Sequence, residues 1–361
     1  MPESSMPEPR FSEPPGFKPT PTSQIADRVA AIGTTAVIGE LLGDVPSPGQ
    51  GRYSKDDLLD HSDAEWADFP LSVLVVPNTT IAAETPTLTG LSQCCVADRY
   101  SEKYGVELYL ASDQRDPEGV RTTFRAHAEA GTPFGLLLSD NPLGTNFTKA
   151  GSHSTPTAVI PDRERGTCRI VQMDSMDNDL ATDRTEATLS ALIAESRDVG
   201  MEPELVRFPG GRQAGYKGCH IDALQILKEV LKDDAAVGRS MPSIGRKNLS
   251  TDDGQRVGLV ETRAPTSLHK TSQRSAFLTA NNHVPEAEYG KPGVNIESHR
   301  TKHTKMLGVT TALVGTRGRE VNMFLTAKGL QYAEVAAARL GSVPAEQYDQ
   351  ALAALTRKRV V

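Results

Sequence analysis

Residues 208–232 read FPGGRQAGYKGCHIDALQILKEVLK, a glycine-rich run that stops at a cysteine where an apolar pattern begins. Apolar residues then recur at intervals of three and four positions, which is the spacing of one face of an α-helix. The pattern therefore predicts a helix that starts at Cys219. Its apolar face consists of Ile221, Leu224, Leu227 and Leu231.

Cys219 admits three interpretations: a small buried hydrophobe, a metal ligand beside His220, or a nucleophile. The first turn of a helix favours negative charge, and the pKa of a thiol falls there. No second Cys or His lies at the short spacing of zinc ligands, so we expect no metal. Consecutive side chains on a helix point about 100° apart, so we expect the activating base to be a residue other than His220.

His153 is the histidine best placed to be that base. It precedes an apolar run at 155–160, and the turn PDRERG leads to a second run, CRIVQM, that ends at Asp174. If the two runs pair as strands, they place His153 and Asp174 at one end of a sheet, where a carboxylate can orient an imidazole. Asp177 and Asp179 are alternatives for this carboxylate. Each residue taken alone is also explained as a surface residue at a strand end.

Gln213 stands in the glycine-rich loop that leads to Cys219. The glycines of this loop allow its backbone to come close to a ligand. A neutral amide there can donate a hydrogen bond to the oxyanion that develops during acyl transfer. Glutamine is also an ordinary loop residue, so its role depends on the other site residues.

The composition limits the class of protein. The chain has 361 residues, of which 38% are apolar and 5% aromatic, and its formal net charge is −7. The acidic balance argues against a general nucleic-acid-binding surface but not against a local basic pocket. Cysteines are too few for a disulfide framework, which favours a reducing compartment. We expect no membrane span, because no run reaches about 18 apolar residues.

Short apolar runs bounded by Gly, Pro and Asp predict strands. These runs are 71–76, 106–111, 134–139, 157–160, 168–173 and 204–208. Helices are expected at 23–42, 55–69 and 187–196, and after Cys219. The irregular alternation favours an α+β fold with a mixed or antiparallel sheet over a regular parallel βαβ series.

The chain divides into four expected regions. Residues 1–24 are rich in Pro, Ser, Glu and Thr and are predicted to be disordered, because they bury too little apolar surface to offset their ordering entropy. Residues 25–90 are expected to form an N-terminal helical region, and residues 91–240 a catalytic core. Residues 241–361 are expected to form a C-terminal region that contains a basic segment.

The chain order of His153, Asp174, Gln213 and Cys219 resembles that of the ubiquitin-like-protein proteases and the adenovirus-type proteases. Their spacing is similar to that of the YopJ family of type III secreted acetyltransferases. The segment LHKTSQRSAFL is similar to the stretch of that family in which a lysine becomes autoacetylated, and Lys270 is the counterpart here. The resemblance runs from about residue 93 to residue 270, with a fainter continuation to about residue 340.

Two positions depart from the family's pattern. His220 follows the cysteine where many members have glycine, and Asp174 stands where several relatives have glutamate. The second departure is chemically tolerable, since either carboxylate can orient a histidine. The resemblance implies a ubiquitin-like-protease-type core, papain-like but permuted, with a mixed sheet flanked by helices, a mainly C-terminal regulatory region and a disordered N-terminus.

The resemblance also implies a chemistry. His153 would deprotonate Cys219, Asp174 would orient the imidazole, and Gln213 would donate to the oxyanion. The acetyl group would pass from acetyl-CoA to Ser, Thr or Lys of host proteins, after secretion by a type III system into the host cytoplasm or, alternatively, the nucleus. A protease of ubiquitin-like conjugates is the alternative that keeps the same residues, and a non-catalytic effector that binds a host protein is the third hypothesis.

Inositol hexakisphosphate is the allosteric activator that the resemblance implies. Lys and Arg side chains are expected to converge on its phosphates, although the 3′-phosphate of coenzyme A would compete for some of them. A solvated basic face or a partner-docking patch is the alternative interpretation. The candidates are Arg121, Arg125, Lys291, His299, Arg300, Lys302, His303, Lys305, Arg317 and Arg319.

Overall fold

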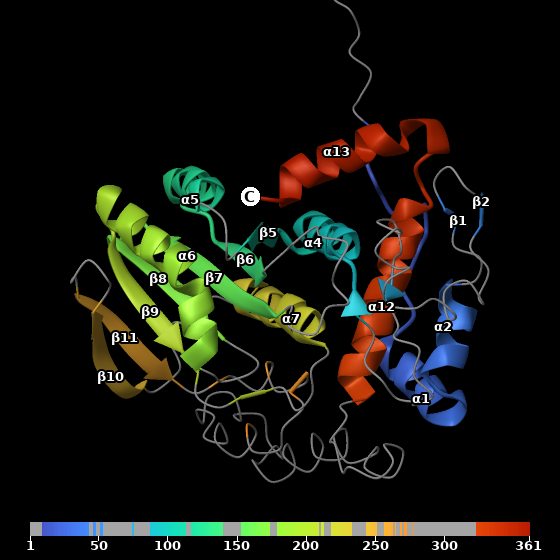
Figure 1. The fold of residues 1–361 in the computed structure, drawn as a ribbon, viewed down its shortest axis with the longest axis horizontal. Helices are drawn as coiled ribbons and strands as arrows, with labels where there is room; N and C mark the ends of the chain where they lie inside the picture. Colours follow the sequence, from blue (N-terminus) through green and yellow to red (C-terminus); the bar gives the residue numbers. More distant parts are fainter. Residues whose placement is uncertain are drawn as a thin grey trace, which may run out of the picture.

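The computed structural model describes residues 9–42, 46–47, 51–52, 74–75, 87–112, 117–139, 153–173, 179–208, 211–212, 218–232, 243–250, 256–262, 264, 268, 271–272, 277 and 323–361. These residues form a central sheet with helices on both of its faces (Figure 1). Its strands are β5 (Glu107–Ser112), β6 (Phe134–Ser139), β7 (Ser154–Asp162), β8 (Thr167–Gln172), β9 (Glu202–Arg207), β10 (Ser243–Ser250) and β11 (Arg256–Thr262).

The sheet has the order β10-β11-β9-β8-β7-β6-β5 and contains both parallel and antiparallel pairs. β5 runs parallel to β6, and β9 runs parallel to both of its neighbours, β8 and β11. The pairs β6–β7, β7–β8 and β10–β11 are antiparallel. The predicted α+β class with a mixed sheet flanked by helices is therefore confirmed. Two short ladders join β1 (Pro46–Ser47) to β2 (Gly51–Arg52) and β3 (Leu74–Val75) to β4 (Thr87–Leu88).

The apolar runs from residue 106 onward coincide with β5 to β9. β6 is buried along its whole length, as a continuous apolar run predicts. β10 and β11 lie in a polar stretch for which the sequence predicts no strand. In β11 the buried apolar side chains are those of Val257 and Leu259, and two such residues are too few to form a recognisable alternating pattern. β10 pairs with β11 alone and forms an edge of the sheet, where polar residues are tolerated.

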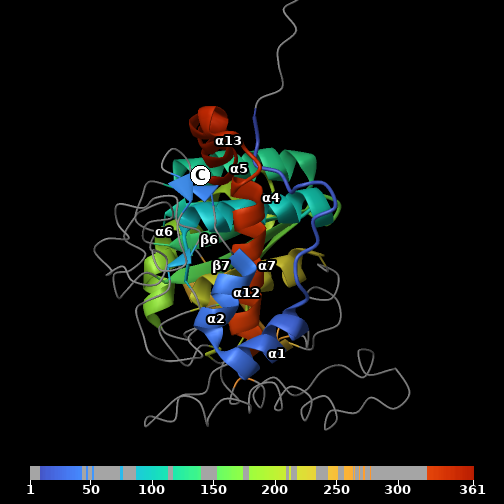
Figure 2. The same cartoon turned by 90° about the vertical axis from the view of Figure 1, so that its right-hand side faces the viewer.

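The helices form two separate cores on the two faces of the sheet. The helical segments are α1 (Thr22–Ile32), α2 (Thr34–Leu42), α4 (Gly90–Tyr104), α5 (Glu118–Ala130), α6 (Asp179–Asp198), α7 (Cys219–Lys232), α12 (Met323–Leu340), η3 (Ala345–Gln347) and α13 (Tyr348–Arg359). α5 and α6 cover one face, with Phe124 and Leu192 in their core. α4 and α7 cover the other, and α12 stands against α1, α2 and α4 on that side (Figure 2). Among the described helices, none has both the length and the apolar character needed to cross a bilayer.

The single helix predicted over residues 23–42 is wrong, because the chain breaks it into α1 and α2. The break lies at Gly33, whose φ of 85° falls in the left-handed region that ends helices and favours glycine. The helix predicted over residues 55–69 lies outside the described residues.

The disorder predicted for residues 1–24 is wrong from Pro9 onward, and residues 1–8 lie outside the described part. Phe11 is buried, and its ring meets that of Tyr348 edge to face with centroids 5.2 Å apart. Arg339 donates a hydrogen bond of 2.8 Å to the Phe11 carbonyl, and the Thr20 N–H donates to Glu334 at 2.9 Å. A few contacts with distant helices hold this segment, and its own composition does not reveal them.

A glycine in β6 allows α7 to lie close on the sheet. A Cβ added to Gly135 would come within 2.7 Å of Leu108, 3.1 Å of Leu227 and 3.0 Å of Leu231. The two leucines of α7 therefore occupy the space that any other residue at position 135 would fill. Their burial fixes the position of α7, and with it the position of Cys219 at the helix start.

One carboxylate ties α12 and α13 to α4. Arg339 and Arg359 are fully buried and donate to Asp98 at 2.7 and 2.8 Å, and Lys358 donates to the same carboxylate at 2.6 Å. Burial raises the pKa of Asp98, but the hydrogen bonds from Lys358 and Arg359 outweigh burial and leave this pKa below its usual value. The carboxylate is thus held ionised between its partners.

Replacing Asp98 with alanine is expected to lower the free energy of unfolding by about 3–5 kcal/mol, because two buried guanidinium groups lose a common partner. Chemical denaturation followed by circular dichroism measures the change. The control is Glu40→Ala, which breaks the exposed pair with Arg28 and should cost about 0–1 kcal/mol. Equal losses in the two variants would contradict the role assigned to Asp98.

Candidate active site

Cys219 is the first residue of α7, as the apolar spacing predicts. The residue before it, Gly218, has a φ of 92°, which glycine adopts without strain. The Asp222 N–H donates a hydrogen bond of 2.9 Å to the Gly218 carbonyl and closes the first turn. The Cys219 side chain is buried at this helix N-terminus, with 2% of the residue's surface exposed.

The structure brings His153 and Cys219 together. His153 directly precedes β7, and α7 packs across β7, so the start of the strand meets the start of the helix. The imidazole is buried and makes a side-chain hydrogen bond with the Cys219 sulfur. A buried imidazole bonded to a thiol is the arrangement that generates a thiolate nucleophile.

His220 also contacts the thiol, so the expectation that helix geometry separates the two side chains is wrong. Cys219 Sγ lies 3.7 Å from His220 Nδ1 and 3.8 Å from Nε2. The angle of about 100° holds for the Cα–Cβ directions, but an imidazole is long enough to turn back toward its neighbour. His220 is buried in this position.

The surroundings of Cys219 favour its thiolate form. Burial opposes ionisation, but the charge of His220, the hydrogen bonds from His153 and His220 and the charge of His153 outweigh burial. Together they lower the pKa of Cys219 from 9.0 to about 5. Burial instead raises the pKa of Cys94 to about 12 and that of Cys168 to about 11, and it also raises the pKa of Cys95. Cys219 is therefore distinguished chemically from the other cysteines.

A buried ion pair anchors the first turn of α7. Arg212 donates two hydrogen bonds to Asp222, of 2.9 and 2.8 Å, and a third of 3.1 Å to Thr271 Oγ1. Thr271 donates to Asp222 in turn, and the Phe277 ring lies 4.7 Å from the guanidinium carbon. The network joins Arg212 and Thr271 to the first turn of α7. Composition and spacing give no signal for it.

Most other predicted site residues lie outside the described part of the chain. These are Asp174, Gln213, Lys270, Lys291, His299, Arg300, Lys302, His303, Lys305, Arg317 and Arg319. The antiparallel pairing assumed for the strands after His153 is present, since β7 pairs with β8 and the Met173 N–H approaches the Pro156 carbonyl at 3.4 Å. Asp174 directly follows this paired segment in the sequence.

Two of the residues predicted to bind the polyanion, Arg121 and Arg125, are described by the structure, and both donate hydrogen bonds to one carboxylate. Both lie on α5, and Glu195 of α6 accepts from Arg125 at 2.6 and 2.8 Å and from Arg121 at 3.3 Å. This pair therefore links α5 to α6. A phosphate at the same place would share both guanidinium groups with Glu195.

A second group of cations, which the sequence does not single out, surrounds a cavity of about 150 Å³ between α4, α7 and α12. Arg99 and Lys103 come from α4, Lys228 from α7 and Lys328 from α12. Arg99 is paired with Glu13 and Lys228 with Glu229, but neither carboxylate is among the residues that line the cavity. Tyrosine rings complete its wall: Tyr100, Tyr104 and Tyr332. The cations are far apart in sequence, which is why no motif reveals them.

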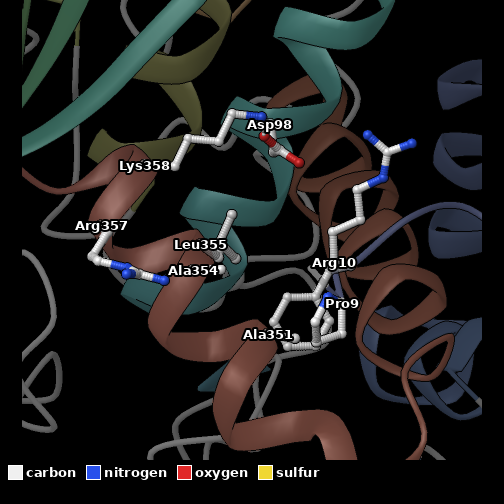
Figure 3. Close-up of a pocket in the computed structure, with 9 residues that line it drawn as sticks. Pro9, Arg10, Asp98, Ala351, Ala354, Leu355, Arg357 and Lys358 are labelled. Atoms are coloured by element: carbon white, nitrogen blue, oxygen red, sulfur yellow. Dashed lines mark hydrogen bonds and ion pairs between the residues drawn. The ribbon is translucent and has the colours of Figure 1, made fainter. Parts of the chain in front are cut away.

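A wider cavity of about 940 Å³ lies between the Pro9–Phe11 segment, α4 and α13 (Figure 3). Arg10, Lys358, Ala351 and Leu355 are among the residues that line it (Figure 3). None of its described lining residues belongs to the group around Cys219.

No protein-family model and no curated protein matches the sequence. Among solved structures, AvrA with IP6 and CoA is 12% identical to the chain, and the match spans 88% of this chain and 97% of AvrA with a TM-score of 0.42. HopZ1a in complex with IP6 is 10% identical over 89% of this chain and 97% of its own, with a TM-score of 0.41. Both are YopJ-family effectors.

RavZ, an effector of Legionella pneumophila, is 14% identical over 37% of this chain and 40% of its own, with a TM-score of 0.24. At these identities and TM-scores, the likenesses assign no activity to the chain. A functional assignment therefore depends on the geometry around Cys219.

The thiolate of Cys219 is expected to titrate with a midpoint near pH 5. Because the pKa is lowered, the thiolate persists above this pH and is lost as the pH falls through it. The ultraviolet absorbance of the thiolate, followed against pH, measures the midpoint. Cys219→Ser should abolish the transition, whereas Cys168→Ser should preserve it. A midpoint near about 8.5, the ordinary value of a thiol, would contradict the site described.

Proposed function

We propose that the chain is a protein acetyltransferase that carries the acetyl group of acetyl-CoA on Cys219 and passes it to Ser, Thr or Lys of host proteins. The observation that supports this most is the buried Cys219 thiol at the start of α7, whose pKa His220 and His153 lower to about 5. Acetyl-CoA as donor and host proteins as acceptors follow from the sequence resemblance to the YopJ family. The same resemblance implies that the protein acts in the host cell after type III secretion.

In the first step the Cys219 thiolate attacks the carbonyl carbon of the acetyl thioester. The new bond joins Cys219 Sγ to the acetyl carbon, and the bond from that carbon to the sulfur of coenzyme A breaks. His153, which holds the proton of Cys219, gives it to the departing sulfur. Asp174 is proposed to orient the imidazole during this transfer.

In the second step a hydroxyl or amine of the acceptor attacks the acetyl carbon. His153 accepts the acceptor's proton, and Cys219 leaves as a thiolate. The oxyanion of both steps would be bound by Gln213 and by backbone N–H groups of the first turn of α7. Asp222 lies in this turn, but its charge is paired with Arg212, so it opposes neither the thiolate nor the oxyanion.

The cations between α4, α7 and α12 are proposed to receive phosphates of inositol hexakisphosphate. The cavity of about 150 Å³ admits phosphate groups rather than the whole molecule, so other cations would bind the remainder. The predicted basic residues from Lys291 to Arg319 are the proposed source. Lys228 belongs to the helix that begins at Cys219, so an anion bridging it to Lys103 and Lys328 would couple the catalytic helix to α4 and α12.

The purified chain should incorporate label from acetyl-CoA into itself and into an acceptor protein, and inositol hexakisphosphate should raise the rate. Cys219→Ala and His153→Ala should each lower transfer by at least about 100-fold, because they remove the acyl carrier and its base. The matched control is Cys168→Ala, which removes a buried cysteine of raised pKa and should leave transfer intact. Mass spectrometry is expected to locate an acetyl group on Lys270.

The competing functions give different results in the same experiment. A chain that transfers no label but reacts through Cys219 with a ubiquitin-like activity probe is a protease, and the proposal then fails. A chain whose effect in host cells survives Cys219→Ala is a binding effector.

The polyanion site is tested by isothermal titration calorimetry with inositol hexakisphosphate. The double variant Lys103→Gln, Lys328→Gln should bind at least about tenfold more weakly, because each lysine supplies a charge-assisted hydrogen bond. Arg165→Gln, on the exposed turn between β7 and β8, is the control and should bind normally. Unchanged binding in the double variant would move the whole site to the Lys291–Arg319 segment.

A further inference from the structure

We propose that His220 is a second catalytic histidine, which stabilises the Cys219 thiolate and makes it a good leaving group when the acyl-enzyme is discharged. This inference rests on the proposed acyl transfer and assigns a role to a residue that departs from the family's pattern. His153 transfers the proton in each step of the reaction, and His220 stabilises the negative charge on sulfur without taking up a proton.

The geometry of the contact separates the two roles. Cys219 Sγ is nearly equidistant from the two nitrogens of His220, at 3.7 and 3.8 Å. A straight N–H···S bond from one nitrogen would leave the other much farther away, so neither N–H of His220 points at the sulfur. The sulfur instead faces the ring as a whole. The charge of His220 accordingly lowers the Cys219 pKa more than its hydrogen bond does, whereas for His153 the hydrogen bond has the larger effect. We therefore assign the proton transfer to His153 and the stabilisation of the thiolate by charge to His220.

The position of His220 makes this charge effective. The residue is 3% exposed and Cys219 is 2% exposed, so little water screens the interaction between them. The two residues are consecutive on α7, and the helix holds their backbone positions fixed. His153 lies just before β7, on a different part of the chain, so its contact with the thiol is independent of the His220 contact.

Among the residues that the structure describes, His153 and His220 are the charged groups that act on the Cys219 thiol. On α7 itself Asp222 is paired with Arg212. β6 and β4, which also pack on α7, contain no ionisable side chain. Tyr332 of α12 donates to Gln225, more than a helical turn beyond Cys219, and Tyr100 of α4 pairs with Tyr332 there.

The second half of the reaction depends most on this charge. When the acceptor attacks, its proton passes to His153, the bond between the acetyl carbon and Sγ breaks, and both electrons of that bond return to sulfur. A thiol of lower pKa leaves faster but attacks less strongly. His220 is thus expected to accelerate discharge of the acyl-enzyme more than its formation.

The test compares His220→Gln with the wild-type chain in two measurements. The first is the thiolate titration by ultraviolet absorbance, which needs no acetyl-CoA. The midpoint should rise by about one pH unit in the variant, so that below the wild-type midpoint the variant holds about tenfold less thiolate. The second is intact-protein mass spectrometry during turnover, in which acetylated Cys219 should accumulate. His220→Phe, which keeps an aromatic ring without ionisable nitrogens, replaces the first variant if His220→Gln does not fold.

The control is His127→Gln, which removes a histidine bonded to Tyr109 on the other face of the sheet and should leave both measurements unchanged. A midpoint that rises by less than about half a unit overturns the inference. A raised midpoint without accumulation, in a chain that does transfer acetyl, also overturns it. If no chain transfers acetyl, the proposed function fails, and the titration alone then decides whether His220 holds the thiolate.

Discussion

A thiolate removed from water is tolerated only where positive charge faces it, and the described structure around Cys219 satisfies this condition from two sides. β7 brings His153 to the start of α7, and the first turn of α7 supplies His220. The helix N-terminus adds its own dipole. The other cysteines are buried as well, and although Arg359 lowers the pKa of Cys94 and Arg339 that of Cys95, burial outweighs these charges and leaves the thiols protonated.

Because the thiolate lies at the start of α7, its stabilisation also depends on the residues that hold this helix in place. Leu227 and Leu231 lie over Gly135 of β6, so the distance between α7 and the sheet depends on the absence of a side chain at position 135. Arg212 neutralises Asp222 in the first turn, where an unpaired carboxylate would disfavour a thiolate. Thr271, which follows the predicted autoacetylation site Lys270 in the sequence, bonds to Arg212 and Asp222 and is thereby attached to α7.

The sequence predicts those features that depend on local spacing. The apolar runs predict β5 to β9, and the three–four spacing predicts the start of α7 at Cys219. His153 is predicted from its place before a strand, and the packing of α7 across β7 brings it to the thiol. The contact with His220 escapes prediction because side-chain length, not helix angle, decides it. Arg212 and the cations between α4, α7 and α12 escape it because they meet only after the chain has folded. Asp174, Gln213 and the basic segment remain predictions.

The attachment of Phe11 to Tyr348, and of Asp98 to Arg339 and Arg359, has a consequence for folding. Phe11 and Tyr348 lie near opposite ends of the described chain, and Asp98 is 241 residues from Arg339 and 261 from Arg359, so these contacts close long loops. Such contacts form late, because the entropy of closing the loop is lost before the contact returns any energy. The face of the sheet that holds α7 therefore depends for its completion on contacts between parts of the chain that lie far apart in sequence.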